Sequence, residues 1–294
     1  MRVLATVHVF YPEFWPELAK CIRQVDVPCD VAVTLPEGSC FASAIGRDFP
    51  EARIIFCENR GFDIWPLFKT LDEVGLAGYT HVLKLHTKRD VHTDPPTTFN
   101  AFNYEGARWR EALLSFLSGE GAFAKCRTLF ERDPSVSMIA GRDVIVRRRD
   151  VKHPAVRRTF DEALAYAVDT FGIRPRRPEF VAGTMFIAKA EVFAPFLGRF
   201  SAQSFVPSVK DDTVVTRAHL LERALGFAAC AVGRIADPDD SMRLRHLRSD
   251  LTYVSDSLRR FFYQSKTTGR GARIMKVCRI PVWHSRGKHD ETPL

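Results

Sequence analysis

The sequence lacks the cysteine and membrane patterns that define several large classes of protein. Its seven cysteines are an odd number and stand singly, with no C-x-x-C pair. This argues against a disulfide framework and a zinc knuckle, and it suits a reducing compartment. No apolar run approaches the roughly 20 residues of a membrane-spanning helix. The short apolar start is followed at once by Tyr11, Pro12 and Glu13, so we expect a buried strand there, not a signal peptide, and a soluble cytoplasmic chain.

The motifs of the commonest cofactor and nucleophile chemistries are also missing. The sequence contains no P-loop, no G-x-G-x-x-G, no serine nucleophile elbow, no H-E-x-x-H and no EF-hand loop. Asp-Asp pairs occur only at 211–212 and 239–240, and the tail residues His284 and His289 have no ligand spacing. We therefore expect no metal site and no bound cofactor.

Short β-rich runs alternate with stretches of helical hydrophobic spacing in the first half of the chain. The expected strands are 2–10, 30–35, 52–57 and 80–85, and the expected helices are 13–24, 39–48 and 63–74. This alternation predicts an α/β, Rossmann-like fold with a mainly parallel sheet and helices on both faces. In such sheets ligands bind beyond the carboxyl ends of the strands.

The second half continues with a less regular pattern. The expected helices are 106–118, 122–132, 159–172, 190–197 and 213–225, and the expected strands are 136–140 and a single buried strand over 180–188. An amphipathic helix is expected over 253–266. Because 237–250 are polar and charged, we expect one domain over 1–236 and a basic helical extension over 237–294.

The net charge of +8 belongs to the last part of the chain. Residues 241–294 hold 12 of the 43 Lys and Arg and 4 of the 35 Asp and Glu, so the first 240 residues hold 31 of each sign. A neutral body with a basic tail indicates an anionic partner at the tail. Nucleic acid is not the partner we expect, because the tail has no recognisable nucleic-acid-binding motif.

The turn at 58–63 follows an expected strand and opens an expected helix. Gly61 permits a positive φ or a close approach to a ligand, and Asn59 suits a turn. Arg60 could grip a phosphate and Asp63 could accept a sugar or ribose hydroxyl. The equally weighted alternative is structural, with Asp63 as a helix N-cap and Arg60 at the surface.

The strand end at 84–89 is unusually cationic. Strand alternation places Lys84, His86 and Lys88 on one side if the strand continues that far. Burying Lys84 in an apolar strand is costly unless it meets an anion, so this row of donors suits a diphosphate, with His86 as a phosphate donor or proton shuttle. The alternative is a strand edge with solvated lysines.

Two further segments carry weaker signals. Asp211 and Asp212 open an expected helix, where a carboxylate is commonly a cap but can also act as a general base for a hydroxyl nucleophile. The small residues at 182–184 interrupt an apolar run and would allow a ligand to approach the strand closely.

Taken in order, these segments resemble the rhamnan synthesis protein F family, bacterial polysaccharide-assembly enzymes regarded as glycosyltransferases. The segments that carry the resemblance are 8–12 with Trp15, 59–63, 84–88, 109–114, 182–186, and 211–213 with Glu222 and Arg223. The resemblance covers residues 3–228, and its Asp-Gly-Thr stands here as Asp211-Asp212-Thr213.

The resemblance implies a GT-A-type enzyme that moves a sugar, rhamnose or another deoxyhexose, from a nucleotide-diphosphate donor to a growing polysaccharide or lipid-linked acceptor. It implies substrate-binding roles for His8, Asn59, Arg60, Gly61, Asp63, Lys84, Thr87, Lys88, Trp109, Arg110, Gly183 and Thr184, and catalytic roles for Asp211, Asp212 and His86. Where related folds place a metal-binding D-x-D, this chain has His86-Thr87-Lys88, which suggests transfer without a metal.

Two alternatives stay open. The chain could be a catalytically silent subunit that binds sugar nucleotide or glycan within an assembly complex. The tail over 251–280 could contact the inner face of the cytoplasmic membrane, since an amphipathic helix followed by arginines suits anionic lipid, or it could pack on the body.

Overall fold

Four parallel strands form the first half of the main sheet. The structure is a computed structural model that describes residues 1–90, 97–99, 102–104, 106–148, 151, 154–208, 215–239, 263–267, 273–277 and 280–284. The four strands are β1 (Val3–His8), β2 (Cys29–Pro36), β3 (Arg53–Cys57) and β4 (His81–His86), and they lie in the order β3-β2-β1-β4. All pair in parallel, as the sequence predicts.

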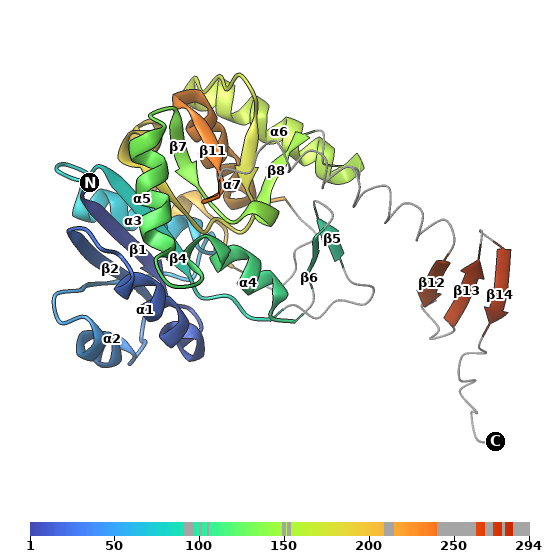
Figure 1. Cartoon of the computed structure of the whole chain (residues 1–294), viewed down its shortest axis with the longest axis horizontal. Coiled ribbons are helices and arrows are strands. Elements are labelled where there is room, and N and C mark those ends of the chain that lie inside the picture. The colour runs from blue at the N-terminus through green and yellow to red at the C-terminus, as the bar shows by residue number, and fades with distance from the viewer. Residues whose placement is uncertain are drawn as a thin grey trace. The chain divides into compact units, whose positions relative to one another are not determined.

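Three helices make the crossovers between these strands. They are α1 (Trp15–Arg23), preceded by the short helix η1 (Pro12–Phe14), then α2 (Ala42–Asp48) and α3 (Ile64–Val74). Because parallel crossovers are right-handed, α1 and α2 cover one face of the sheet and α3, on the return from β3 to β4, covers the other (Figure 1). Helix α3 buries Ile64, Leu67, Phe68 and Leu71 at helical spacing, and it ends at Gly75, whose φ is 75°.

The second half of the sheet contains one antiparallel strand. The strands β7 (Val136–Ile139), β10 (Phe186–Lys189) and β11 (Arg234–Ala236) complete a seven-stranded sheet in the order β11-β7-β10-β4-β1-β2-β3. Strand β10 runs antiparallel to both β4 and β7. Its amino end therefore lies at the edge where β1 and β4 have their carboxyl ends, and the turn before β10 lies at that edge too.

The expected single strand over 180–188 is wrong. Residues of this run form two strands, β9 (Glu179–Val181) and β10, and β9 pairs with β8 (Ile145–Arg147) in a separate two-stranded sheet. The break follows from the backbone, because Gly183 and Thr184 have φ values of 71° and 50°, which no strand contains. The expected fold class is otherwise confirmed.

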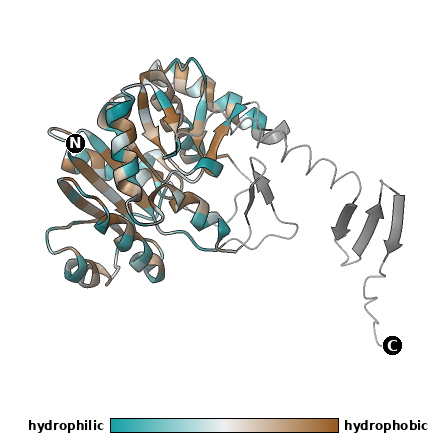
Figure 2. Cartoon of the chain, viewed as in Figure 1, coloured by the Kyte–Doolittle hydropathy of each residue, from teal (hydrophilic) through white to brown (hydrophobic). Residues whose placement is uncertain are grey.

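The remaining helices pack around this sheet. They are α4 (Arg108–Leu114), η2 (Ser115–Leu117), α5 (Ala122–Arg132), η3 (Arg142–Val144), α6 (Pro154–Phe171), η5 (Ala190–Phe196), η6 (Ala202–Ser204) and α7 (Arg217–Val232). Helix α7 contacts α3, α6, β7 and β9, so it shares a face of the sheet with α3. Apolar residues concentrate on the strands and on the inward sides of the helices (Figure 2), where Phe160 packs against Phe180 and Phe227 at centroid distances of 5.8 and 5.1 Å.

Residues 1–91 and 106–240 form one compact unit, and 92–105 with 241–294 form a second. In the second unit β5 (Thr97–Phe99) pairs with β6 (Phe102–Tyr104), and β12 (Tyr263–Thr267), β13 (Arg273–Val277) and β14 (Ile280–His284) form an antiparallel sheet. The helix expected over 253–266 is therefore wrong at 263–266, and 253–262 lie outside the described residues. The boundary at 236/237 and the membrane contact of 251–280 stay predictions.

Among the residues that the structure describes, no helix is both long enough and apolar enough to cross a membrane.

Candidate functional site

The strand order reverses beside β1, and this switch point is where α/β sheets place their ligands. The chain runs from β1 outward to β2 and β3 and then returns to β4 on the other side of β1. His8 ends β1 and His86 ends β4, and the two residues are partners in the register of these strands. The sheet topology therefore brings the predicted residues of 8, 63 and 84–88 to one edge.

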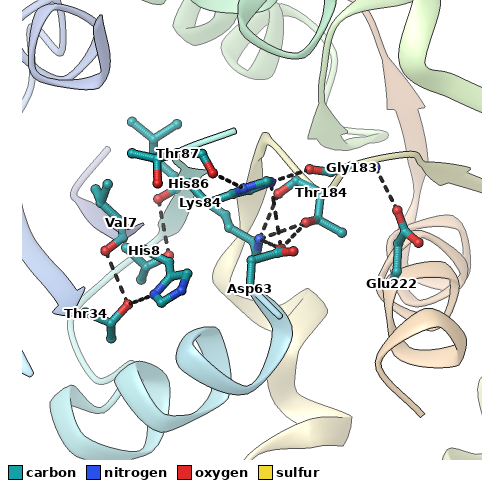
Figure 3. Close-up of polar contacts among 12 residues, drawn as sticks. Val7, His8, Thr34, Asp63, Lys84, His86, Thr87, Gly183, Thr184 and Glu222 are labelled. Atoms are coloured by element: carbon teal, nitrogen blue, oxygen red, sulfur yellow. Dashed lines mark hydrogen bonds and ion pairs between the residues drawn. The ribbon is translucent and has the colours of Figure 1, made fainter. Parts of the chain in front are cut away.

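Lys84 is the buried centre of the site. Its side chain is only 2% exposed, and its ammonium contacts the Asp63 carboxylate (Figure 3). The same Nζ atom donates to the backbone oxygen of Thr184 at 3.0 Å and to the Thr184 hydroxyl at 2.8 Å. Burial lowers the pKa of Lys84, and the negative charge of Asp63 opposes that shift. The anion that the sequence predicts for Lys84 thus comes from the protein itself.

Asp63 occupies the position of a helix N-cap, but its side chain makes no capping hydrogen bond to α3. Its Oδ2 atom instead meets both Lys84 and the Thr184 hydroxyl. Burial acts to raise the pKa of Asp63, but the charges of His86 and Lys84 and the hydrogen bonds from Lys84 and Thr184 outweigh it, so the pKa lies well below its usual value. Asp63 is therefore an ionised carboxylate held in one orientation, which excludes the simple capping role.

His86 is oriented by the turn before β10. Its Nε2 atom lies 2.7 Å from the Gly183 carbonyl oxygen and 3.9 Å from the Asp63 Oδ2, while Nδ1 lies 3.2 Å from the Thr87 carbonyl oxygen. Both contacts are to carbonyl oxygens, which only accept, and a neutral imidazole has one N–H, so the shorter contact assigns the proton to Nε2. Burial lowers the pKa of His86 to about 4. His86 is thus a donor to the protein, and its predicted catalytic role would require that bond to open.

The turn at 182–185 is a strained element that several parts of the fold hold in place. Thr184 is β-branched and has a φ of 50°, which is sterically unfavourable. The Gly183 N–H donates to Glu222 Oε1 on α7 at 2.7 Å, and a side chain at Gly183 would clash with Leu113 at 2.6 Å and meet Trp109 at 3.0 Å. The sequence-based prediction of site residues omitted Glu222, because a carboxylate within a helix gives no signal of its partner.

Thr side chains fix both the loop after β1 and the end of β1 itself at this edge. The Thr87 hydroxyl accepts hydrogen bonds from the backbone N–H groups of Phe10 and Tyr11, both at 2.9 Å. The His8 Nδ1 atom lies 3.0 Å from the Thr34 hydroxyl. Burial lowers the pKa of His8 to about 3, so this imidazole is neutral at physiological pH. Thr87 therefore positions the loop after β1 rather than presenting its hydroxyl to solvent.

The predicted turn at 59–62 is tied to the segment 205–208. The Arg60 Nη1 atom donates to the Phe205 carbonyl at 2.9 Å, and the Ser208 N–H donates to the Asn59 carbonyl at 3.1 Å. Gly61 has the predicted positive φ, at 60°, but the group that approaches it closely is the Phe205 ring, 2.6 Å from where a Cβ would stand. Ligand contacts of these residues stay predictions.

Trp109 and Arg110 lie at the start of α4. Trp109 is buried beside Gly183, while the Arg110 guanidinium contacts Asp90 and donates to Glu17 Oε2 at 2.7 Å. The structure therefore explains both residues as packing and cross-linking elements next to the site. Their predicted contacts with substrate stay untested.

Among the residues that the structure describes, Lys88 is a cation at this edge that remains available. It is half-buried, and no residue in the described part of the chain forms a hydrogen bond or ion pair with it. Its charge is close enough to lower the pKa values of Lys84 and His86. An anionic group of a ligand would find a free ammonium here.

The predicted catalytic residues Asp211 and Asp212 lie outside the described residues. Among the described residues, no three His, Cys, Asp or Glu side chains gather as metal ligands. What the described site offers is a fixed carboxylate, a neutral imidazole at His8 and a free ammonium at Lys88. This combination suits a ligand that carries both hydroxyl groups and negative charge.

Comparison with known proteins identifies the family of the chain. The profile of the family described as rhamnan synthesis protein F matches residues 1–233. Two proteins named uncharacterized protein WxcX, from Xanthomonas campestris pv. campestris strains B100 and ATCC 33913, are 27% and 26% identical over 235 residues. The alignments cover 77% of this chain and 31% of each relative, so the chain spans about a third of their length. The predicted family is confirmed: the chain belongs to the rhamnan synthesis protein F family, which ties it to polysaccharide synthesis.

Proposed function

We propose that this protein is a glycosyltransferase that moves a sugar from a nucleotide-diphosphate donor to a polysaccharide or lipid-linked acceptor. One observation carries the proposal: a buried polar cluster of Asp63, Lys84 and Thr184 lies at the switch point of a doubly wound sheet. Buried charges are costly, so an ion pair at the ligand-binding edge of such a sheet favours a binding role over a purely structural one. The family's link to polysaccharide synthesis agrees with a sugar as the ligand.

The roles of individual residues follow from their surroundings. Lys88 is the cation that would meet the diphosphate, because Lys84 already contacts three acceptors of the protein. The resemblance to the family assigns the acceptor base to Asp211 or Asp212. We expect Asp211→Asn or Asp212→Asn to abolish transfer while donor binding survives, and full activity in both variants would remove that assignment.

We also propose that transfer needs no divalent metal. The strand that ends at His86 is followed by Thr87 and Lys88. Related folds place a D-x-D motif at this position, and its two carboxylates need a divalent cation before a diphosphate can bind beside them. This chain has no carboxylate at these three positions, so it has no such need for a cation there. Activity that disappears in EDTA and returns with Mn²⁺ would contradict this proposal.

The test of the function combines binding and turnover. Thermal-shift measurements against UDP-, GDP- and dTDP-sugars, with and without Mn²⁺, identify the donor, and ligand binding raises the midpoint by mass action. Transfer of a radiolabelled sugar to a polysaccharide or lipid acceptor then establishes the reaction. If no nucleotide sugar shifts the midpoint, the proposed function is wrong.

A catalytically silent subunit is the second candidate. It is favoured by His86 and Lys84, whose donors the protein itself engages. This candidate predicts nucleotide-sugar binding with neither transfer nor donor hydrolysis. For either candidate we propose that the basic tail over 251–280 docks on anionic lipid, and liposome flotation that is unchanged on deleting 251–294 would exclude it.

A further inference from the structure

The two oxygens of the Asp63 carboxylate have different surroundings. Oδ2 meets the Lys84 ammonium and the Thr184 hydroxyl. Oδ1 accepts no hydrogen bond from any residue that the structure describes, and the Asp63 side chain is 19% exposed. One oxygen is therefore anchored within the protein while the other is left at the ligand-binding edge of the sheet.

Lys84 has no donor left for a ligand. An ammonium has three N–H donors, and the Lys84 Nζ atom has three acceptors: Asp63 Oδ2, the Thr184 hydroxyl and the Thr184 carbonyl. At 2% exposure it also lies out of reach of solvent. Lys84 can therefore influence a ligand only by orienting and charging the Asp63 carboxylate.

We propose that Asp63 is the residue that recognises a hydroxyl group of the ligand, and that Lys84 and Thr184 are positioning residues that aim its Oδ1 atom. An ionised carboxylate accepts hydrogen bonds and repels phosphate, so it binds a hydrogen-bond donor, and the hydroxyl groups are the most numerous donors of a nucleotide sugar. Within the proposed function this donor belongs to the sugar or to the ribose of a nucleotide sugar. The diphosphate then lies toward Lys88, whose ammonium is free of partners within the described residues.

The binding test is a double-mutant cycle with Asp63→Asn, Lys84→Met and the double variant, all in the full chain. Asp63→Asn alone leaves a buried ammonium without its counter-ion, which destabilises the folded state. The double variant removes both charges at nearly constant volume, so it tests the carboxylate in a folded protein. The control is Arg2→Met with Asp30→Asn, an exposed ion pair at the opposite, amino end of β1 and β2.

The probes are UDP, GDP and dTDP and the same nucleotides carrying glucose, mannose or rhamnose, with dissociation constants measured by calorimetry. We expect the double variant to lose about tenfold or more in affinity, the value of a hydrogen bond to a charged group. A loss confined to the nucleotide sugars assigns the hydroxyl to the transferred sugar, and an equal loss for the nucleotides alone places the contact on the nucleoside and contradicts a sugar hydroxyl. The control pair should bind like wild type.

The same variants also test whether Lys84 contacts the ligand directly or only positions Asp63. If Lys84 acts only through Asp63, adding Lys84→Met to Asp63→Asn changes affinity by less than about twofold. A further loss for the diphosphates, together with a weaker salt dependence, would show that Lys84 binds phosphate and would overturn its positioning role. Wild-type affinity in the double variant would overturn the role of Asp63 while the proposed function stands, whereas a wild-type protein that binds no probe would remove both.

Discussion

Breaking the buried ion pair between Lys84 and Asp63 should destabilise the fold strongly, and removing both charges should not. The pair is 2% and 19% exposed at its two side chains. Truncating one partner of such a pair leaves an uncompensated buried charge, which costs about 3–5 kcal/mol. Lys84→Met and Asp63→Asn should each lower the free energy of unfolding by roughly this amount. The double variant should lie within about 1–2 kcal/mol of wild type, since a neutral pair of similar volume is often tolerated.

Urea denaturation followed by circular dichroism measures these changes. In thermal unfolding of a domain of this size, a loss of about 1 kcal/mol in stability lowers the midpoint by roughly 2–4 °C. The midpoint of each single variant should therefore lie roughly 6–20 °C below that of wild type. The matched control is Arg2 with Asp30, a 2.8 Å ion pair with side chains 55% and 51% exposed, whose removal should cost less than about 1 kcal/mol. The reasoning is refuted if the single variants match this control, or if the double variant loses the sum of the two single losses.

Three other predictions follow from the site. Gly183→Ala should have a lower midpoint of thermal unfolding than Gly172→Ala. Both glycines have a positive φ, of 71° and 69°, but only at Gly183 would a side chain clash, with an atom 2.6 Å away. Equal midpoints would contradict this packing. Glu222→Leu should lower the free energy of unfolding by about 1–3 kcal/mol in urea denaturation, because it leaves the part-buried Gly183 N–H unpaired. Glu222→Gln should cost less because its amide oxygen still accepts, and identical losses would show that the bond is unimportant. The pKa of His86 is lowered to about 4 in the folded state from about 6.5 unfolded, so the unfolded chain binds the extra proton between these values, and the contribution of His86 to stability should fall by about 3 kcal/mol as the pH drops from 6.5 to 4. The pKa values of His8 and His81 are lowered to about 3 and about 4, so they add to the same loss. His86→Gln should therefore make the dependence of stability on pH shallower without removing it, and an unchanged slope would contradict this.

Much of the fold could be predicted from the sequence because local patterns determine it. The four strands of the first half alternate with amphipathic helices, and their expected bounds agree with β1 to β4 to within a few residues. The break between β9 and β10 could not be predicted from hydrophobicity, since Phe180 and Phe186 are both buried. What breaks the strand is the left-handed backbone at Gly183 and Thr184, which depends on contacts with α4, α7 and β4.

The location of the candidate site could be predicted from the sequence, but the bonds between its side chains could not. Strand ends at a switch point identify His8, Asp63 and His86 from topology alone. The sequence also indicated that Lys84 must meet an anion, but not that Asp63 supplies it. That pairing depends on the side-chain direction of the residue before α3, which strand and helix periodicity do not specify.

The bonds that assemble the site join residues that are far apart along the chain. Lys84 and Thr184 are separated by 100 positions, His86 and Gly183 by 97, and Asp63 and Thr184 by 121. Contacts of such long separation form late, because the loop that they close must first lose its conformational freedom. During synthesis the Lys84 ammonium therefore cannot reach its acceptors on Thr184, in the turn before β10, until β10 has emerged and inserted between β4 and β7. Ligand binding at this edge consequently reports on completion of the whole sheet, and a fragment that ends after β7 should acquire secondary structure without acquiring the site.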